Sequence, residues 1–184
     1  AEAFLGASAW EPHVPGVLRR LGEAARMSRV YVFENHHRAD GLLVTGHRYE
    51  WCAPGIAPQI DNPELQDVDY LEAGYARWIE VLGDGKFVAG HVRDLPEPER
   101  QVLKAQGILS IAIMPIAVEG VWWGFIGFDA CITEHEWSEA ELDALQTAAN
   151  TFGAAIQRQR AERALADARD KALQASHLKS EFLA

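Results

Sequence analysis

Hydrophobic side chains in the last quarter of the chain recur at alternating steps of three and four residues, which predicts one apolar stripe along a helix: Leu142, Leu145, Ala149, Phe152 and Ile156. Ser138 and Glu141 have the spacing of a capping box, in which each satisfies a backbone N–H of the other. Trp137 and Leu142 flank this start as a hydrophobic staple would. Because Gly153 is the single glycine after Ser138 and no proline follows, we expect one long helix.

The pattern of this helix changes after Ile156. Charged residues become dense, and the smaller apolar residues fall on a heptad seam that is offset from the first stripe. An alanine-rich seam flanked by charges can be buried against a copy of the same helix. We therefore predict a compact domain over residues 1–156 and a coiled-coil helix over residues 157–184. Its homodimer interface would include Leu165, Ala168, Ala172, Ala175 and Phe182. A solvated helix without a partner is the alternative.

Upstream, β-branched and aromatic runs alternate with amphipathic segments, so we expect both strands and helices. The predicted helices cover residues 14–25, 70–82 and 95–106, and the predicted strands cover residues 29–33, 42–52, 86–89, 109–118 and 121–130. Glu119 and Gly120 form the turn between the last two strands. Pro115 donates no backbone hydrogen bond, so we expect a bulge or an unpaired position there.

This order of elements predicts an α+β fold built on an antiparallel sheet. Both strands of the last hairpin are apolar on both faces, so both faces of the sheet must be covered. The terminal helices would cover one face, and the segments 53–82 and 91–106 would lie over the other as a lid. Residues 53–69 contain three prolines and no clear period, which is typical of a long functional loop. A pocket is expected between the sheet and this lid.

Aromatic residues on the strands and the lid are the candidates for lining that pocket, and His91 is added to them. The predicted ligand-binding residues are Tyr31, Phe33, Tyr49, Trp51, Trp78, His91, Trp123 and Phe125. The alternative is that these aromatic rings only form the core, since half of the residues in a strand face inward. The cofactor is unknown, and a small-molecule partner remains unidentified.

Composition and charge exclude several classes of function. A net charge of −10 argues against a nucleic-acid surface, which needs a basic field. The chain has no apolar run long enough to span a bilayer and no signal peptide. Two cysteines, Cys52 and Cys131, suit a reducing cytoplasm and are expected to be inert buried thiols. The chain stops inside a helical pattern, so we expect it to be a piece of a longer protein.

We find neither a catalytic nor a metal-binding pattern. The seven histidines lack a ligand spacing with carboxylates or thiols, which predicts no metal site. No nucleophile–base arrangement, no glycine-rich phosphate loop and no pair of carboxylates on one helical face is recognisable, so this segment is expected to be non-catalytic.

Several strings of the sequence carry a resemblance to a known family: Ser28–Asn35, Trp51–Ile56 with Gln59–Asn62, Ala105–Ser110, Trp122–Asp129 and Trp137–Glu141. Together they resemble the GAF domain of bacterial signalling proteins over most of residues 14–160. Residues 179–184 resemble the start of the dimerisation helix of sensor histidine kinases. The flanking motifs expected for bilin attachment and the motif of cyclic-nucleotide-binding GAF domains are not recognisable.

The resemblance implies a GAF-like sheet and a sensory input module of a two-component histidine kinase, without the kinase's catalytic parts. The parent protein would then be a kinase. The coiled-coil helix over residues 157–184, which we call the exit helix, would carry the signal from the domain to the kinase core. Three alternatives remain open: a ligand-free dimerisation module whose pocket is filled by its own side chains, a GAF input to another output such as a diguanylate cyclase, and a chromophore-bearing photoreceptor.

Overall fold

The computed structural model describes residues 9–182, and the side chains up to residue 176. Six strands form one sheet in the order β3-β2-β1-β6-β5-β4, and every neighbouring pair is antiparallel. The strands are β1 (Arg29–His37), β2 (Leu43–Cys52), β3 (Val68–Asp69), β4 (Val88–His91), β5 (Ser110–Val118) and β6 (Val121–Ala130). This confirms the predicted α+β class and the antiparallel sheet.

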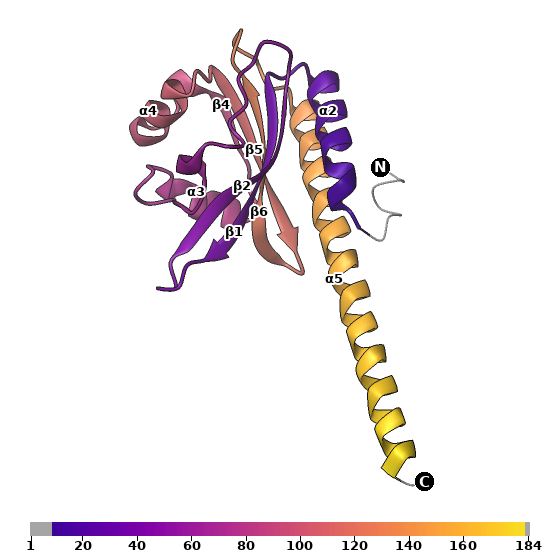
Figure 1. Cartoon of the computed structure of the whole chain (residues 1–184). Coiled ribbons are helices and arrows are strands. Elements are labelled where there is room, and N and C mark those ends of the chain that lie inside the picture. The colour runs from indigo at the N-terminus through magenta and orange to yellow at the C-terminus, as the bar shows by residue number, and fades with distance from the viewer. Residues whose placement is uncertain (1–8, 183–184) are drawn as a thin grey trace.

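Helices cover both faces of the sheet, as predicted. Helix α2 (Val14–Ala25) and the first part of α5 (Glu139–Phe182) lie side by side on one face. Helices α3 (Ala76–Gly83) and α4 (Glu97–Ala105) lie on the other (Figure 1). Short 3-10 turns, η1 (Glu11–His13), η2 (Pro63–Leu65) and η3 (Val92–Asp94), connect these elements.

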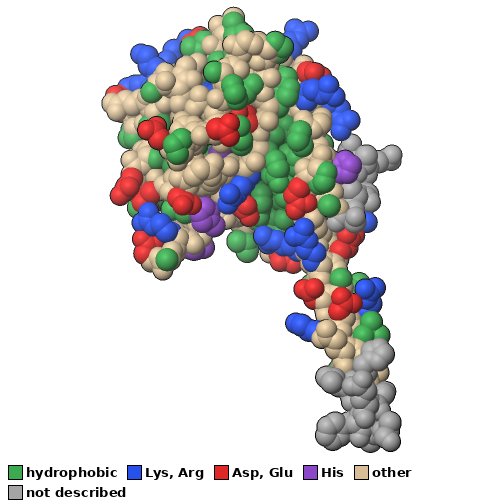
Figure 2. Space-filling model, viewed as in Figure 1, with side chains coloured by type: hydrophobic (Ala, Val, Ile, Leu, Met, Phe, Trp, Pro, Cys, Tyr) green, Lys and Arg blue, Asp and Glu red, His purple; other side chains and the backbone are tan. Residues whose placement is uncertain are grey.

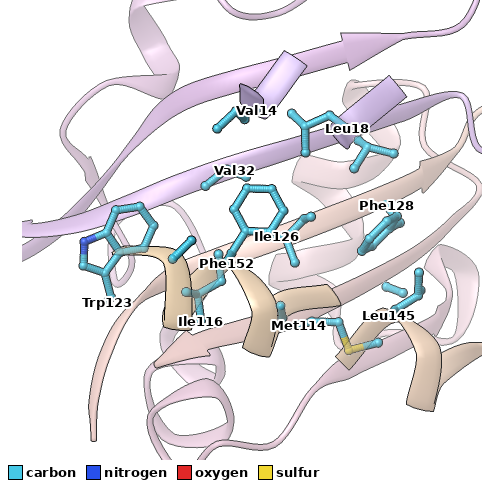
Figure 3. Packing of buried hydrophobic residues seen from close by; sticks show 14 of the residues in the cluster. Val14, Leu18, Val32, Met114, Ile116, Trp123, Ile126, Phe128, Leu145 and Phe152 are labelled. Atoms are coloured by element: carbon cyan, nitrogen blue, oxygen red, sulfur yellow. The ribbon is translucent and has the colours of Figure 1, made fainter. Parts of the chain in front are cut away.

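The core beneath the terminal helices is built by the predicted apolar stripe of α5. Leu145, Ala149, Phe152 and Ile156 are buried, and Leu142 is half-buried against the same cluster. Figure 3 shows the Phe152 ring of α5 among side chains from α2 and the strands. Burial of each large apolar side chain stabilises the fold by roughly 1.5–3 kcal/mol, so this face holds α5 firmly.

The start of α5 has the predicted capping box. The Ser138 backbone N–H donates to Glu141 Oε2 at 2.9 Å, and the Glu141 backbone N–H donates to Ser138 Oγ at 3.3 Å. From there α5 runs for 44 residues, or about 66 Å at 1.5 Å per residue. Its second half extends beyond the domain as a protruding rod (Figures 1 and 2).

The predicted helix over residues 70–82 is wrong in its first half, because α3 begins only at Ala76. Gly74 has a φ of +83°, which a right-handed helix does not permit. Asp69 Oδ1 also accepts a hydrogen bond from the Leu71 backbone N–H at 2.8 Å and so competes with helical bonding. Leu71, in this part, is exposed, whereas Trp78 and Leu82 of α3 are buried.

Smaller differences concern the ends of elements and Pro115. The strand predicted at residues 86–89 is displaced to Val88–His91, and the helix predicted at 95–106 is shorter, Glu97–Ala105. Pro115 itself pairs with Phe125, and the irregularity follows between Ile116 and Ala117. Because pairing with β4 ends at Ile113, the strand edge at Pro115 has no partner there, which is where proline is tolerated.

Phe152→Ala should lower the free energy of unfolding by about 3–5 kcal/mol. The substitution leaves a cavity in the middle of the core between the sheet and helices α2 and α5, which we call the helix-side core. Urea unfolding followed by tryptophan fluorescence measures this change. The matched control is Ile132→Ala, since Ile132 is 72% exposed, and its effect should stay within about 0.5 kcal/mol. Equal effects of the two substitutions would contradict this packing.

Candidate functional site

A cavity lies between the sheet and the lid, at the predicted place. Side chains of β1, β2, β6, α3 and α4, with parts of residues 59–75, line it. Its free volume is about 60 Å³, which exceeds the roughly 10–15 Å³ that a cavity needs to hold one water molecule. The occupant of such a space is therefore a small one.

The walls of the cavity are largely aromatic. His47 stacks on Phe33 with ring centroids 4.6 Å apart, and Phe33 stacks on Phe125 at 5.0 Å. Both pairs are parallel to within 7°. Trp78 meets Phe125 edge-on at 5.8 Å, and Tyr31 meets Phe33 edge-on at 5.6 Å. Such pairs contribute about 0.5–1.5 kcal/mol each beyond burial, so the walls are rigid.

A buried ion pair forms one end of the cavity. Arg29 and Asp129 are joined at 3.2 Å, with only 5% and 1% of their side chains exposed. The Tyr31 hydroxyl donates to Asp129 Oδ1 at 2.8 Å. Burial raises the pKa of Asp129 to about 6, although the Arg29 charge and the Tyr31 hydrogen bond act in the opposite direction. A buried pair of this kind is weak support for stability but fixes the geometry of its neighbours.

Among the buried polar atoms of the cavity lining, Nε1 of Trp78 lacks a hydrogen-bond partner, whereas the His47 ring lies beside the backbone of Gln59 and Tyr49. His47 is 4% exposed and Trp78 is 3% exposed. Glu50 Oε2, by contrast, accepts the backbone N–H groups of Gln59 and Ile60 at 2.8 and 3.0 Å. Burial lowers the pKa of His47, which favours its neutral imidazole. Unpartnered buried polar atoms are costly, so Trp78 is held in place by its packing and not by its indole N–H.

The predicted site residues lie in three different places. Tyr31, Phe33, Trp78 and Phe125 line the cavity. Tyr49, Trp51 and Trp123 pack instead in the helix-side core. His91 lies at the edge of the sheet, outside the cavity. Sequence reasoning missed the polar lining, above all Arg29, His47, Glu50 and Asp129.

Two β-bulges explain the separation. Val32 pairs with Tyr49 and Phe33 pairs with His47, so Arg48 is an extra residue in β2. In β6, the shift between Ile116 and Ala117 of β5 leaves Trp123 as the extra residue. An extra residue reverses the alternation of side chains beyond it. Alternation alone therefore assigns Tyr49 and Trp123 to the wrong face.

His91 belongs to a chain of hydrogen bonds that we call the polar junction: His91, Ser110, His135, Glu136 and Glu141. His91 contacts Ser110 Oγ at 2.9 Å and Glu136 Oε1 at 2.7 Å through its two ring nitrogens. Ser110 Oγ also accepts the His135 backbone N–H at 2.9 Å, and the His135 ring contacts Glu141 at 3.1 Å. The junction thus ties the edge of β4 and β5 to the capping box of α5.

The two cysteines are placed as poor nucleophiles. Burial raises the pKa of Cys52 to about 12 and also raises that of Cys131. Both are therefore thiols, not reactive thiolates, near neutral pH. Within the described part of the chain, no three potential ligands gather as a metal site would require, and no helix has the length and apolar character needed to cross a membrane.

Comparison with known proteins identifies relatives of the chain. The GAF domain family matches residues 14–156. A methanogenesis regulatory histidine kinase, FilI, of Methanothrix harundinacea is 46% identical over 144 residues, which are 78% of this chain and 16% of that protein. An uncharacterised protein of Azorhizobium caulinodans is 25% identical over 86% of this chain and 22% of its own length. The chain therefore spans less than a quarter of either relative.

Solved structures share the fold at low sequence identity. The phycocyanobilin-bound GAF domain of a cyanobacterial phytochrome has a TM-score of 0.67 at 18% identity, covering 83% of this chain and 86% of that one. A domain of a Sinorhizobium meliloti protein assigned as a two-component sensor histidine kinase has a TM-score of 0.63 at 20% identity, covering 86% and 98%. At these identities the likeness establishes the fold alone.

Asp129 should make stability depend on pH. Its pKa is about 6 in the folded protein and 3.8 when unperturbed, so the folded state holds its proton more tightly. The stabilisation is present at low pH and is lost as pH rises through 6. Relative to Asp129→Asn, the free energy of unfolding of the wild type should fall by about 2 kcal/mol between pH 4.5 and 7. Urea titrations of both proteins across this pH range measure the difference. If the unfolding free energies of the wild type and of Asp129→Asn changed with pH in the same way, the raised pKa of Asp129 would be contradicted.

Proposed function

Because the chain belongs to the GAF domain family, we propose that it is the sensory input module of a two-component histidine kinase. Occupancy of the cavity would alter the pose of α5, and the paired exit helices would carry the change to a kinase core outside this chain. The 46% identity to a regulatory histidine kinase supports a kinase output. That relative extends well beyond the matched part, so the kinase activity belongs to the parent protein.

One observation carries the proposal: β6 is shared between the cavity and α5. Phe125 and Asp129 line the cavity on one face of this strand. Ile126 and Phe128 lie on the opposite face, in the cluster that holds Phe152 of α5. Since protein interiors are close-packed, a displacement of β6 by an occupant reaches α5 directly. If α5 can adopt two poses, a ligand shifts the balance between them only if it binds one pose more tightly than the other.

The polar junction gives a second connection. It joins β4 and β5 to Glu141, which caps α5, so a shift of the sheet edge also reaches the start of the helix. The Ser138 hydrogen bonds and the neighbouring His135 lower the pKa of Glu141, which keeps its carboxylate charged as the cap requires.

The exit helix supports a homodimer as the signalling unit. Leu165 is 72% exposed, and Ala168, Ala172 and Ala175 are exposed as well. The side chain of Phe182 lies outside those described. These exposed apolar side chains would be removed from water if the helix paired with the same helix of a second chain. Charged residues beside the seam would then set the register of the pair (Figure 2).

Three other candidates stand beside this one. The cavity of about 60 Å³ is small, which favours a dimerisation module filled by its own side chains. The likeness to a phycocyanobilin-bound domain suggests a chromophore, but a tetrapyrrole needs far more than this free volume, and both thiols have a raised pKa. An input to a diguanylate cyclase would use the same exit helix, and the sequence that follows this chain in the parent protein distinguishes it.

In the full-length parent protein, Ala164→Pro should lower the rate of autophosphorylation by about tenfold or more. Proline inside a helix removes a hydrogen bond and kinks it at a cost of about 3 kcal/mol. Ala164 is exposed and lies eight residues after Ile156, the last residue of α5 in the buried cluster, so the core stays folded. A phosphate-transfer assay measures the rate, and Ala164→Ser is the control at the same position. An unchanged rate in the proline variant would count against a signal carried by α5.

Ala168→Glu should convert the chain from a dimer to a monomer at micromolar concentration, because it places like charges face to face on the predicted seam. Ala166→Glu introduces the same charge off the seam and should leave the dimer intact. Both alanines are exposed in the single chain, so neither change disturbs the domain. Sedimentation equilibrium gives the masses, with a chain ending at Arg158 as the monomer reference. A monomeric wild type would end the pairing hypothesis.

A further inference from the structure

We propose that the polar junction is a proton-operated switch at the start of α5, which is closed while His91 is neutral and opens when His91 takes up a proton. The proton is then an input to the domain that is independent of the cavity. Three observations carry the inference: both ring nitrogens of His91 are hydrogen-bonded, Ser110 is fully buried between two partners, and the junction ends on the carboxylate that caps α5. The effect of the switch on a kinase, though not the switch itself, rests on the proposed function.

The segment that the junction holds is residues 131–138, between β6 and α5, which we call the strap. It contains neither helix nor strand, so contacts with other elements fix its path. Three contacts join it to the edge of the sheet and to η3: Glu136 with His91, the His135 backbone N–H with Ser110, and Glu134 with Arg93. Because α5 begins directly after the strap, the position of the strap sets the start of the helix.

The contacts of His91 match a neutral ring, which has one donor and one acceptor nitrogen. Its Nε2 lies 2.7 Å from Glu136 Oε1, and since a carboxylate only accepts, Nε2 carries the hydrogen. Nδ1 is then the acceptor of the Ser110 hydroxyl group at 2.9 Å. Ser110 Oγ in turn accepts the His135 backbone N–H at 2.9 Å. In this state each of these groups has a partner.

A second proton on His91 reverses its hydrogen bond to Ser110. Nδ1 becomes a donor, so Ser110 Oγ faces two N–H groups and its own hydrogen loses its acceptor. Ser110 is 0% exposed, so water does not replace that acceptor, and among the described residues the structure gives the hydroxyl group no second one. A buried donor without a partner costs more than an ordinary hydrogen bond contributes. Proton uptake therefore breaks the junction.

The charged groups around His91 are too exposed to reverse this result. They belong to the strap and to η3: Arg93, Asp94, Glu134 and Glu136. Glu136 attracts a proton to His91, but its side chain is 90% exposed, so water screens the attraction. The hydrogen bond from His91 and, more weakly, the Arg93 charge lower the pKa of Glu136. Arg93 thus shares this carboxylate and opposes a second positive charge beside it.

His135 responds to a proton in the opposite direction. Its Nε2 lies 3.1 Å from Glu141 Oε1, so a proton on His135 strengthens that contact. The Glu141 side chain is 42% exposed, and this pair is also screened by water. Two further charges, of opposite sign, line the groove beside His135 from the end of α2: Glu23 and Arg26. The ring of His135 therefore keeps its contact in both states, and His91 operates the switch.

The His135 backbone N–H is the donor that leaves Ser110 when the junction opens. His91 belongs to β4 and is paired with Ser110 across the ladder to β5, whereas His135 lies in the irregular strap. Its departure frees the strap three residues before Ser138, which caps α5. Histidine side chains gain a proton between about pH 8 and 5. The strap is therefore held at the upper end of this range and is released as pH falls.

Hydrogen exchange of the His135 amide measures the switch, because this N–H donates to Ser110 in the closed state. Its protection factor, which corrects for the intrinsic effect of pH on exchange, should fall at least about tenfold between about pH 8 and 5.5 in the wild-type chain. The amides of β5 and β6 should keep their protection over the same range, which shows that the domain remains folded.

His91→Gln is the decisive variant. A glutamine amide has an acceptor oxygen and a donor nitrogen and so replaces the neutral ring, but it takes up no proton in this range. The His135 amide should then be protected equally at both pH values. His36→Gln is the matched control, because His36 contacts the Asp67 carboxylate at 2.6 Å but belongs neither to the strap nor to the polar junction. It should keep the pH dependence of the wild type, as should Asp129→Asn.

Three results would overturn the proposal. The first is equal protection of the His135 amide at both pH values in the wild type. The second is an undiminished pH dependence in His91→Gln. The third comes from Ser110→Ala, which removes the acceptor of the His135 N–H and should leave this amide unprotected at both pH values. Protection that persists in Ser110→Ala would contradict the bond on which the switch depends.

The link to the kinase is tested separately in the full-length parent protein. The ratio of autophosphorylation rates of the wild type and His91→Gln should change at least about threefold between about pH 8 and 6, since only the wild type opens the junction. A constant ratio beside a pH-dependent His135 amide would refute the kinase input and leave the switch standing. Constant protection of that amide refutes the switch, whatever the kinase does.

Discussion

The structure depends on a sheet that is buried on both faces and must serve two different cores. One face holds α2 and α5 against an apolar cluster, and the other encloses a partly polar cavity. The bulges at Arg48 and Trp123 decide which aromatic ring enters which core. Without them, Tyr49 and Trp123 would crowd the cavity, and the cluster around Trp10 would lose two of its ring contacts.

The fold could be predicted to a large extent because its strongest signals are local. The stripe from Leu142 to Ile156 and the capping box at Ser138 require only the sequence spacing and a helix period, and both are present in the structure. The hairpin of β5 and β6 was equally clear from its apolar runs and its Glu119–Gly120 turn. The start of α3 was missed because Gly74 and Asp69 act through backbone conformation and a side-chain hydrogen bond, which the helical period does not reveal.

The candidate site could be predicted only in part. Tyr31, Phe33, Trp78 and Phe125 line the cavity as expected, although whether they bind a ligand stays a prediction. His47 and Glu50 were missed because a bulge lies between them, so no simple alternation places both on one face. A signal for Arg29 and Asp129 did exist: opposite charges inside two apolar strands must pair if both are buried. Their register, opposite one another in β1 and β6, follows only from the strand order.

The anchoring of α5 determines what kind of motion the domain can transmit. At Gly153 the helix lies so close to β5 that a Cβ atom would stand 2.2 Å from the Ala117 carbonyl oxygen. The apolar contacts continue to Ile156, and beyond it Gln159 makes a hydrogen bond to Glu11 at 2.8 Å. A helix held this tightly over its first half moves with the sheet and does not slide along it, since close-packed interfaces switch between discrete arrangements. A small tilt of β5 and β6 would therefore be enlarged along the rod, because α5 continues about 39 Å beyond its last apolar contact, Ile156.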